Sequence, residues 1–257
     1  MKNTIEIITV GNEILIGHTL DTNSNWIAKQ ATRRGWTVQR VTQLRDTVVA
    51  IGNGVRESVR RTPTILVTIG GLGPTHDDMT LKGIARALRR PLILNGSALD
   101  MIRKRYKEIE GSPPLTTQRK KMATLPKGAD PVPNPIGTAP GVMTRSGRTR
   151  IFSLPGVPSE MKAIFNQSIG PVLGSSRTGP PQEAYLFLAG IVESALAHVL
   201  SRAQRKFPGL YFKSHPRGKE TGVSPLVQLH IYTLHPRAKG KIPNAAAYLL
   251  SSLSRLS

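Results

Sequence analysis

Short apolar runs that alternate with helical patterns are the feature that most restricts how this chain can fold. Three such runs, rich in β-branched residues, stand at residues 4–10, 37–43 and 64–71. A segment with helical spacing of apolar residues follows each run, at 21–36, 46–61 and 80–90. Short, continuously apolar runs are typical of buried strands. The alternation therefore predicts an α/β fold with a mostly parallel sheet wrapped by helices in three layers.

Further elements are expected after this alternating part. Residues 97–108 and 116–126 have helical patterns. Residues 128–142 are too rich in proline and glycine for the interior of a helix or strand, so we expect a structured loop there. A strand then ends at Leu154, and a helix begins near Pro158, a residue that is tolerated in a first helical turn.

A change in composition divides the chain. Residues 171–183 are rich in glycine, proline and small polar residues and are expected to be a linker. The linker would separate a first domain, residues 1–170, from a small α+β domain, residues 184–257. In the second domain we expect strands at 184–188, 210–213 and 226–232 and helices at 194–206 and 244–253.

Composition excludes several classes of protein. Cysteine is absent, which excludes disulfides, thiolate zinc sites and a cysteine nucleophile. The six histidines are scattered, so a metal site would need oxygen ligands, which suit Mg²⁺ or Mn²⁺. The longest apolar stretch, Tyr185–Val192, is far too short to cross a membrane, and the N-terminus has no signal-peptide cleavage site. A cytoplasmic protein with no membrane partner is therefore expected.

The net charge of +21, with an isoelectric point near 11.1, attracts anions. Affinity for nucleotides or nucleic acids is one interpretation. A basic proteome or colloidal stability is the other, because the charge is spread along the chain and forms no basic tail.

The stretch GGLGPTHDDMT follows the third expected strand. Gly70, Gly71 and Gly73 allow the backbone to approach a ligand, and the next helix begins with free N–H groups that favour phosphate. Asp77 and Asp78 would then hold a divalent cation that bridges to the phosphate. Taken alone, however, the stretch favours a simpler interpretation.

In that interpretation Thr75 and Asp78 form a variant of the capping box, and the acidic residues only compensate the helix dipole. The position of this stretch in the predicted sheet, however, favours a ligand-binding site. Ligands of parallel sheets bind at the carboxyl ends of the strands, and three polar loops follow strands at this edge. These loops are GNEILIGHTLDTNSN, GGLGPTHDD and LPGVPSE.

The first of these loops offers four polar candidates, Glu13, Asp21, Asn23 and Asn25. Glu13 lies between a strand end and the apolar residues ILIG, where a carboxylate needs a partner or a ligand. Asp21 is equally well explained as the cap of the next helix. The two asparagines donate and accept hydrogen bonds, which suits a ribose or a base.

The remaining candidates are less specific. Arg119 is a candidate for a bidentate phosphate contact, although a solvated basic helix face explains it slightly better. Lys82 is a second cation that would offset transition-state charge. Glu160 begins a helix and is a minor candidate for ligand contact. The substrate-binding set is completed by Thr75, in the glycine loop, and by Asn134 and Gly137, in a loop that would form a wall or lid.

Taken together, these stretches resemble the CinA family of competence/damage-inducible proteins, whose first domain has the molybdopterin-binding fold of MoaB and MogA. The matching stretches recur in the family's order over roughly residues 4–170. They are GNEILIGHTLDTNSNWIA, GGLGPTHDDMT, QRKKMATLP, NPIGTAPG and LPGVPSEMKAIF. Residues 185–254 resemble the family's smaller KH-like domain less specifically.

The resemblance implies a metal-dependent ADP-ribose pyrophosphatase that uses Mg²⁺, Mn²⁺ or Co²⁺ and releases AMP and ribose 5-phosphate. By this analogy Asp77 and Asp78 hold the metal and Glu13 joins them in catalysis. Longer members carry an amidohydrolase domain that acts on nicotinamide mononucleotide. The sequence has no counterpart of that domain, so the deamidase activity is not implied.

Two alternatives remain open. The fold and the glycine loop suit a protein that binds molybdopterin or its adenylylated form equally well. Nucleic-acid binding is suggested by the charge, but residues 186–257 contain no GxxG loop of the kind with which a KH domain clamps a nucleic-acid backbone. The small domain would instead serve dimerisation, as in relatives, so a homodimer is expected.

Overall fold

The computed structural model describes residues 3–108, 114–174, 183–217, 226–233 and 236–254. The chain divides into two compact units, which meet in the sequence between Ser175 and Ser176. No helix in these described ranges is long and apolar enough to cross a membrane.

A twisted six-stranded sheet forms the centre of the first unit, in the order β2-β1-β3-β8-β7-β6. Strands β2, β1, β3 and β8 run parallel, and β7 and β6 continue the sheet with antiparallel pairing. The strands are β1 (Thr4–Val10), β2 (Thr37–Leu44), β3 (Ile65–Ile69), β6 (Asp130–Val132), β7 (Gly141–Ser146) and β8 (Thr149–Leu154).

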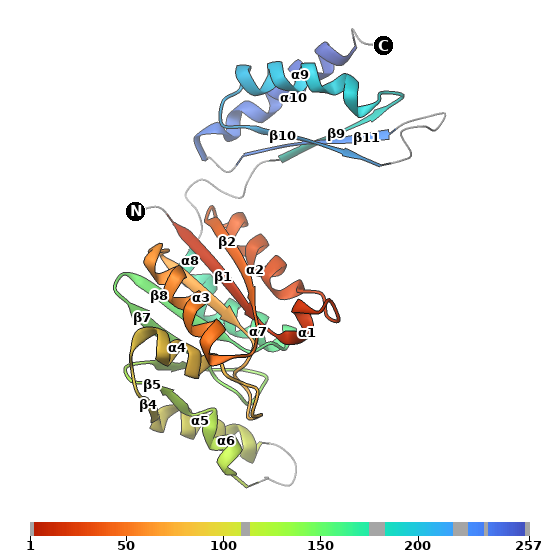
Figure 1. Ribbon diagram of the computed structural model, residues 1–257. Coiled ribbons are helices and arrows are strands. Elements are labelled where there is room, and N and C mark those ends of the chain that lie inside the picture. The colour runs from red at the N-terminus through yellow and green to blue at the C-terminus, as the bar shows by residue number, and fades with distance from the viewer. Residues whose placement is uncertain (1–2, 109–113, 175–182, 218–225, 234–235, 255–257) are drawn as a thin grey trace. The chain divides into compact units, whose positions relative to one another are not determined.

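Helices cover both faces of this sheet, which gives the three layers expected from the sequence (Figure 1). One face is covered by α3 (Val48–Arg60), α4 (Thr80–Leu88) and α5 (Gly96–Lys107). The other face is covered by α2 (Thr22–Arg33) and α7 (Pro158–Ile164), and the latter continues through a π-helical turn (Phe165–Ile169) into α8 (Gly170–Leu173).

Alternation along β1 explains why both faces are needed. Ile5 and Ile7 pack with α2 and α7, whereas Ile8 and Val10 point to the opposite face and pack with α3 and α4. All seven residues of β1 are buried. A strand that is apolar on both sides requires helices on both faces, so the predicted α/β fold is confirmed.

Several boundaries differ from the expectation. The helix predicted over residues 116–126 is wrong, because α6 (Thr117–Lys121) ends early and β5 (Thr124–Pro126) pairs with β4 (Leu92–Leu94). The loop predicted over residues 128–142 contains β6, where Pro131 is tolerated because the strand lies at the sheet edge. The short helix α1 (Asn12–Leu15) and strand β7 were not expected.

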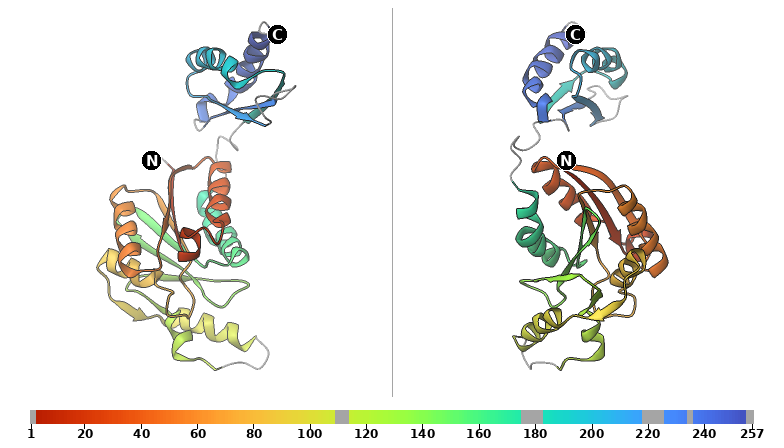
Figure 2. Two further views of the ribbon diagram at one scale, coloured as in Figure 1. Left: turned by 45° about the vertical axis from the view of Figure 1, so that its right-hand side comes forward. Right: turned by 90° about the vertical axis from the view of Figure 1, so that its left-hand side faces the viewer.

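The second unit is a three-stranded antiparallel sheet with two helices. Its sheet order is β10-β11-β9, from β9 (Glu183–Ala189), β10 (Tyr211–Pro216) and β11 (Leu226–Tyr232). Two views show helices α9 (Glu193–Lys206) and α10 (Ile242–Leu253), the latter preceded by a 3₁₀ turn (Pro236–Lys241), on one side of this sheet (Figure 2). The expected linker, residues 171–183, overlaps α8 at its start and β9 at its end. Residues 175–182 lie outside the described ranges.

A buried ion pair joins the first strand to the end of α3. The side chain of Glu6 is 2% exposed, and Nε and Nη2 of Arg61 donate to its two carboxylate oxygens at 2.8 and 2.7 Å. Bidentate geometry of this kind satisfies a carboxylate that is otherwise cut off from water.

Replacing Arg61 with methionine should therefore destabilise the fold by leaving the Glu6 carboxylate unpaired. Breaking a fully buried pair costs roughly 3–5 kcal/mol, and the 35% exposure of Arg61 lets water partly compensate, so we expect about 2 kcal/mol. Urea unfolding measures this change. Arg60→Met, at the exposed neighbouring position, is the control, expected to cost less than about 0.5 kcal/mol. Equal costs for the two variants would contradict the prediction.

Candidate functional site

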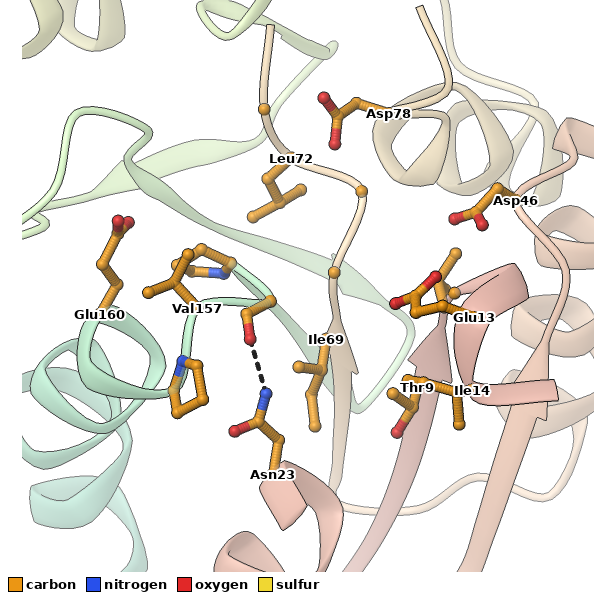
Figure 3. Close-up of a pocket in the computed structure, with 18 of the residues that line it drawn as sticks. Thr9, Glu13, Ile14, Asn23, Asp46, Ile69, Leu72, Asp78, Val157 and Glu160 are labelled. Carbon is orange, nitrogen blue, oxygen red and sulfur yellow. Dashed lines mark hydrogen bonds between the residues drawn. The ribbon is translucent and has the colours of Figure 1, made fainter. Parts of the chain in front are cut away.

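The carboxyl ends of β1, β3 and β8 open onto one cavity of about 540 Å³, named here the main cavity (Figure 3). All three predicted loops contribute to its lining. The predicted site residues that line it are Glu13, Asp21, Asn23, Gly70, Gly71, Gly73, Asp77, Asp78 and Glu160. The expectation that three polar loops meet at one edge of the parallel sheet is therefore confirmed.

Two glycines of the loop after β3 are required by close backbone packing. Gly70 has φ of 95°, and a Cβ atom there would lie 2.5 Å from the carbonyl oxygen of Val10. Gly71 has φ of 67°, and a Cβ atom there would lie 2.4 Å from the hydroxyl oxygen of Thr80. Both backbone conformations are ones that only glycine adopts without strain.

The N–H groups of this loop have different roles. The N–H of Gly70 donates to the carbonyl oxygen of Leu154 at 2.9 Å, so it is not available to a ligand. In the described part of the chain, the backbone N–H groups of Gly71, Leu72 and Gly73 have no hydrogen-bond acceptor. Successive free N–H groups at a turn form an anion-binding concavity. Of the three glycines in the predicted phosphate loop, only Gly71 and Gly73 therefore have an N–H group without an acceptor in the described ranges.

Asp77 and Asp78 both contact Thr75, which places Thr75 inside the turn, outside the lining of the main cavity. The Thr75 hydroxyl lies 2.5 Å from Asp77 Oδ1 and 2.6 Å from Asp78 Oδ2, and the Thr75 N–H donates to Asp78 Oδ2 at 2.8 Å. The hydrogen bond from Thr75 is the main cause that lowers the pKa of Asp77. Because α4 begins only at Thr80, the capping-box interpretation is wrong.

Asp46, which was not among the residues predicted from the sequence, also lines the main cavity. Its Oδ2 accepts the N–H of Asn12 at 2.7 Å. Burial raises the pKa of Asp46, and the charges of Glu13, Asp77 and Asp78 raise it further, against the hydrogen bond from Asn12. Asp46 follows β2 by two residues, so the rule that strand ends share an edge, applied to β2 as well, would have identified it.

Figure 3 shows Glu13 and Asp46 on the same side of the main cavity, with Asp78 above them. Glu13 is exposed, so the argument that its burial demands a partner is wrong. In the described ranges, no group of three or more His, Cys, Asp or Glu side chains has the arrangement of a metal site. The carboxylates are nevertheless the oxygen donors that a hard divalent cation takes.

The two interpretations of Asp21 are both supported. Its Oδ1 caps α2 by accepting the N–H of Ser24 at 2.9 Å, and its Oδ2 accepts the Thr9 hydroxyl at 2.8 Å. Burial alone would raise the pKa of Asp21, but hydrogen bonds from Ser24, Thr9 and Gln43 outweigh burial and lower it. Asp21 therefore lines the main cavity, but both of its carboxylate oxygens already accept hydrogen bonds from within the protein.

Of the two predicted asparagines of the first loop, only Asn23 lines the main cavity. Asn23 Nδ2 donates to the carbonyl oxygen of Gly156 at 2.7 Å and so joins α2 to the loop after β8 (Figure 3). Asn23 Oδ1 is buried without a hydrogen-bond partner in the described ranges. Asn25 is exposed on α2 and does not contribute to the cavity lining.

Asn134 and Gly137 position a neighbour and do not line the main cavity themselves. Asn134 Nδ2 donates to Glu160 Oε2 at 2.7 Å, and Asn134 Oδ1 accepts the N–H of Gly137 at 2.8 Å. A Cβ atom at position 137 would lie 2.1 Å from Glu160 Oε2, so glycine is required for this contact. The loop therefore holds the Glu160 carboxylate at the cavity wall.

A second cavity of about 280 Å³ lies against the same glycine segment and is named here the lysine cavity. It shares Gly71, Leu72, Gly73 and Asp78 with the main cavity, and its basic lining residues are Lys82, Lys120 and Lys121. Lys121 Nζ donates to the carbonyl oxygen of Thr75. Burial lowers the pKa of Lys121, and the charge of Lys82 contributes to this shift.

Arg119 lines neither cavity. Its guanidinium lies 4.3 Å from the ring centroid of Tyr106 and donates to the carbonyl oxygen of Pro114 at 2.5 Å. The phosphate contact predicted for Arg119 is therefore not supported by its position, because packing against Tyr106 holds the side chain away from the site.

The opposite pKa shifts of Asp46 and Asp21 predict opposite pH effects. For Asp46, ionisation destabilises the folded state as pH rises through the raised pKa. Asp46→Asn should therefore raise the melting temperature by about 1–2 °C near pH 7 and leave it unchanged near pH 3. For Asp21, the stabilisation is present above the unfolded pKa and is lost as pH falls through the lowered folded value.

The matched variant Asp21→Asn should accordingly lower the melting temperature near pH 7 and lose this effect in acid. Circular dichroism melts at the two pH values measure both changes. An effect of Asp46→Asn that is the same at both pH values would contradict the prediction.

Two known proteins are similar to this chain over most of its length. A protein from Aeropyrum pernix is 43% identical over 226 residues, which cover 88% of this chain and 83% of the relative. A protein from Pyrobaculum arsenaticum is 40% identical over 259 aligned residues, covering 98% and 96% respectively. CinA from Thermoplasma acidophilum, a protein of unknown function, is a solved structure with 39% identity and a TM-score of 0.62, over 66% of this chain and 98% of its own.

The structural match to CinA supports the resemblance seen in the sequence, whereas the KH-like assignment of residues 184–257 stays a prediction. Residues 6–175 match the family described as the probable molybdopterin binding domain. Since this match covers more than half of the sequence, the chain belongs to the probable molybdopterin binding domain family.

Proposed function

We propose that the first unit binds a phosphorylated heterocycle of the molybdopterin class at the glycine segment Gly71–Gly73. The observation that carries this proposal is the run of three N–H groups that have no acceptor within the described ranges and lie between two cavities. Fixed N–H donors of this kind bind a phosphate with little rearrangement. Membership of the molybdopterin-binding family makes a phosphorylated pterin the first ligand to test.

The charges around the two cavities differ, so each cavity suits a different part of the ligand. Glu13 and Asp46 on the main-cavity side repel a phosphate, whereas Lys82 and Lys121 on the other side of the segment attract one, and Asp78 lines both cavities. The phosphate therefore belongs on the lysine side. A pterin ring carries N–H donors along one edge, and the carboxylates of the main cavity are acceptors for such donors. At about 540 Å³, the main cavity is within the usual size of ligand sites.

This division predicts different effects of lysine variants on two ligands. Lys82→Gln should weaken binding of a phosphorylated pterin by about ten-fold, since it removes a charge-assisted contact, and should not change binding of the dephosphorylated pterin. Isothermal titration under anaerobic conditions measures both affinities. Lys104→Gln, at an exposed position of α5, is the control and should have no effect. Absence of pterin binding by the folded protein would overturn the proposal.

A second candidate function is metal-dependent hydrolysis of a nucleotide diphosphate, with ADP-ribose as the first substrate. The observation that favours it is that carboxylates line the main cavity, among them Glu13, Asp46, Asp77 and Asp78. Of these residues, Asp77 and Asp78 would hold a divalent ion, which when bound neutralises the diphosphate and lowers the pKa of a bound water. Lys82 and the Gly71–Gly73 amides would stabilise the phosphate charge in the transition state.

Hydrolysis predicts release of AMP from ADP-ribose in the presence of Mg²⁺, Mn²⁺ or Co²⁺. The double variant Asp77→Asn/Asp78→Asn should reduce the rate by at least about 100-fold and weaken Mn²⁺ binding measured by electron paramagnetic resonance. Asp100→Asn, on the exposed face of α5, is the control for a changed charge. No AMP above background with any of the three ions would exclude this candidate while leaving pterin binding to be judged by titration.

A further inference from the structure

In the described ranges, helices cover one face of the three-stranded sheet of the second unit, and the opposite face is named here the bare face. Both α9 and α10 pack on the same face, where Leu229 and Ile231 of β11 and Leu196 and Leu249 of the helices form the core (Figure 1). Residues alternate along the strands, so every second side chain points away from this core.

Four aromatic rings form a continuous stack across the bare face. Tyr185 stacks on His230 with a centroid distance of 4.4 Å, His230 on Tyr232 at 4.7 Å, and Tyr232 on Tyr211 at 5.3 Å. The interplanar angles are 11°, 28° and 18°, so the rings are nearly parallel. Strand register explains the stack, because Tyr185 pairs with His230 and Tyr211 pairs with Tyr232.

The stack is held in place, and its end rings are partly exposed. The Tyr185 hydroxyl and His230 Nε2 both contact Glu183 Oε2, at 3.1 and 2.9 Å, which fixes one end. Tyr185 and Tyr211, the end rings, are 45% and 41% exposed, and Phe187 beside them is 66% exposed. Each end ring has one face that no other ring of the stack covers. Planar groups can therefore extend the stack without displacing a side chain.

Charge on this face favours an anionic partner. Strand β10 places Lys213 and His215 on the same face as Tyr211, and Arg217 reaches Gln228 of β11 at 2.6 Å. Residues 176–257 contain eleven Lys and Arg against three Asp and Glu, a formal net charge of +8. Two copies of such a unit repel each other, so self-association through this face is disfavoured.

We propose that the bare face of β9, β10 and β11 binds single-stranded nucleic acid. Unpaired bases would stack on Phe187 and on the end rings Tyr185 and Tyr211, while Lys213 and Arg217 contact phosphates. Bases of a duplex are already stacked on each other, so this surface selects unpaired strands. The mode differs from the GxxG clamp of KH domains, so the lack of that motif in residues 186–257 does not weigh against it.

The test uses the full chain and fluorescence anisotropy with a labelled twelve-nucleotide strand of mixed sequence, as RNA, as DNA and as the DNA duplex. We expect both single strands to bind more tightly than the duplex. Phe187→Ala and Phe187→Leu should each weaken single-strand binding by roughly five-fold or more, because neither residue can stack. Leu250→Ala, at a 52% exposed position of α10, is the matched control and should have no effect.

Charge variants distinguish binding at the bare face from general electrostatic attraction to a basic protein. Lys213→Gln should reduce the slope of log affinity against log salt by about 1, whereas Lys104→Gln in the first unit should not. Equal binding of duplex and single strand, with no effect of either Phe187 variant, would overturn the proposal. Sedimentation that detects a dimer which Phe187→Ala dissociates, without a change in oligonucleotide binding, would overturn it in favour of a second copy. Circular dichroism checks that each variant is folded.

Discussion

The close approach of three strand ends around Gly70 is the constraint on which the site depends. The Gly70 N–H donates to Leu154 at the end of β8, and its Cα lies so close to Val10 at the end of β1 that any side chain would clash. The loops that follow β1, β3 and β8 therefore leave the sheet side by side and surround one cavity. Position in the sheet thus turns three separate polar loops into one site.

The second general feature of the site is that carboxylates gather around the main cavity and lysines around the lysine cavity. Burial is the largest cause both of the raised pKa of Asp46 and of the lowered pKa of Lys121. The charges of Glu13, Asp77 and Asp78 add to the shift of Asp46, whereas the shift of Lys121 is opposed by Asp78 and Asp77 and supported by Lys82. The segment Gly71–Gly73 lies between these two groups of charges. A ligand with a phosphate at one end and hydrogen-bond donors or a bound cation at the other would relieve both imbalances. Phosphorylated pterins and metal-bound nucleotide diphosphates both have this character.

Much of the candidate site was predictable from strand ends and glycines, and the exceptions have physical causes. Asp46 was missed because its sequence position equally suits the start of a helix. Arg119 lines neither cavity, and residue type alone does not reveal its stacking on Tyr106. The sequence left open whether Thr75 and the two aspartates cap a helix or form a site; α4 starts at Thr80, so they form a separate turn. These outcomes depend on contacts between side chains, which a linear pattern does not encode.

The sequence by itself determined the alternation of buried strands and helices, because short runs that are apolar on both sides can only be buried in a parallel sheet covered on both faces. Tertiary structure decided the antiparallel extension through β7 and β6 and the lysines behind the glycine segment. It also decided the aromatic stack of the second unit, whose rings come from three strands and meet only through strand register. Local patterns of apolar residues define the helices and strands, whereas the pairing of strands distant in the sequence decides which side chains meet on a surface.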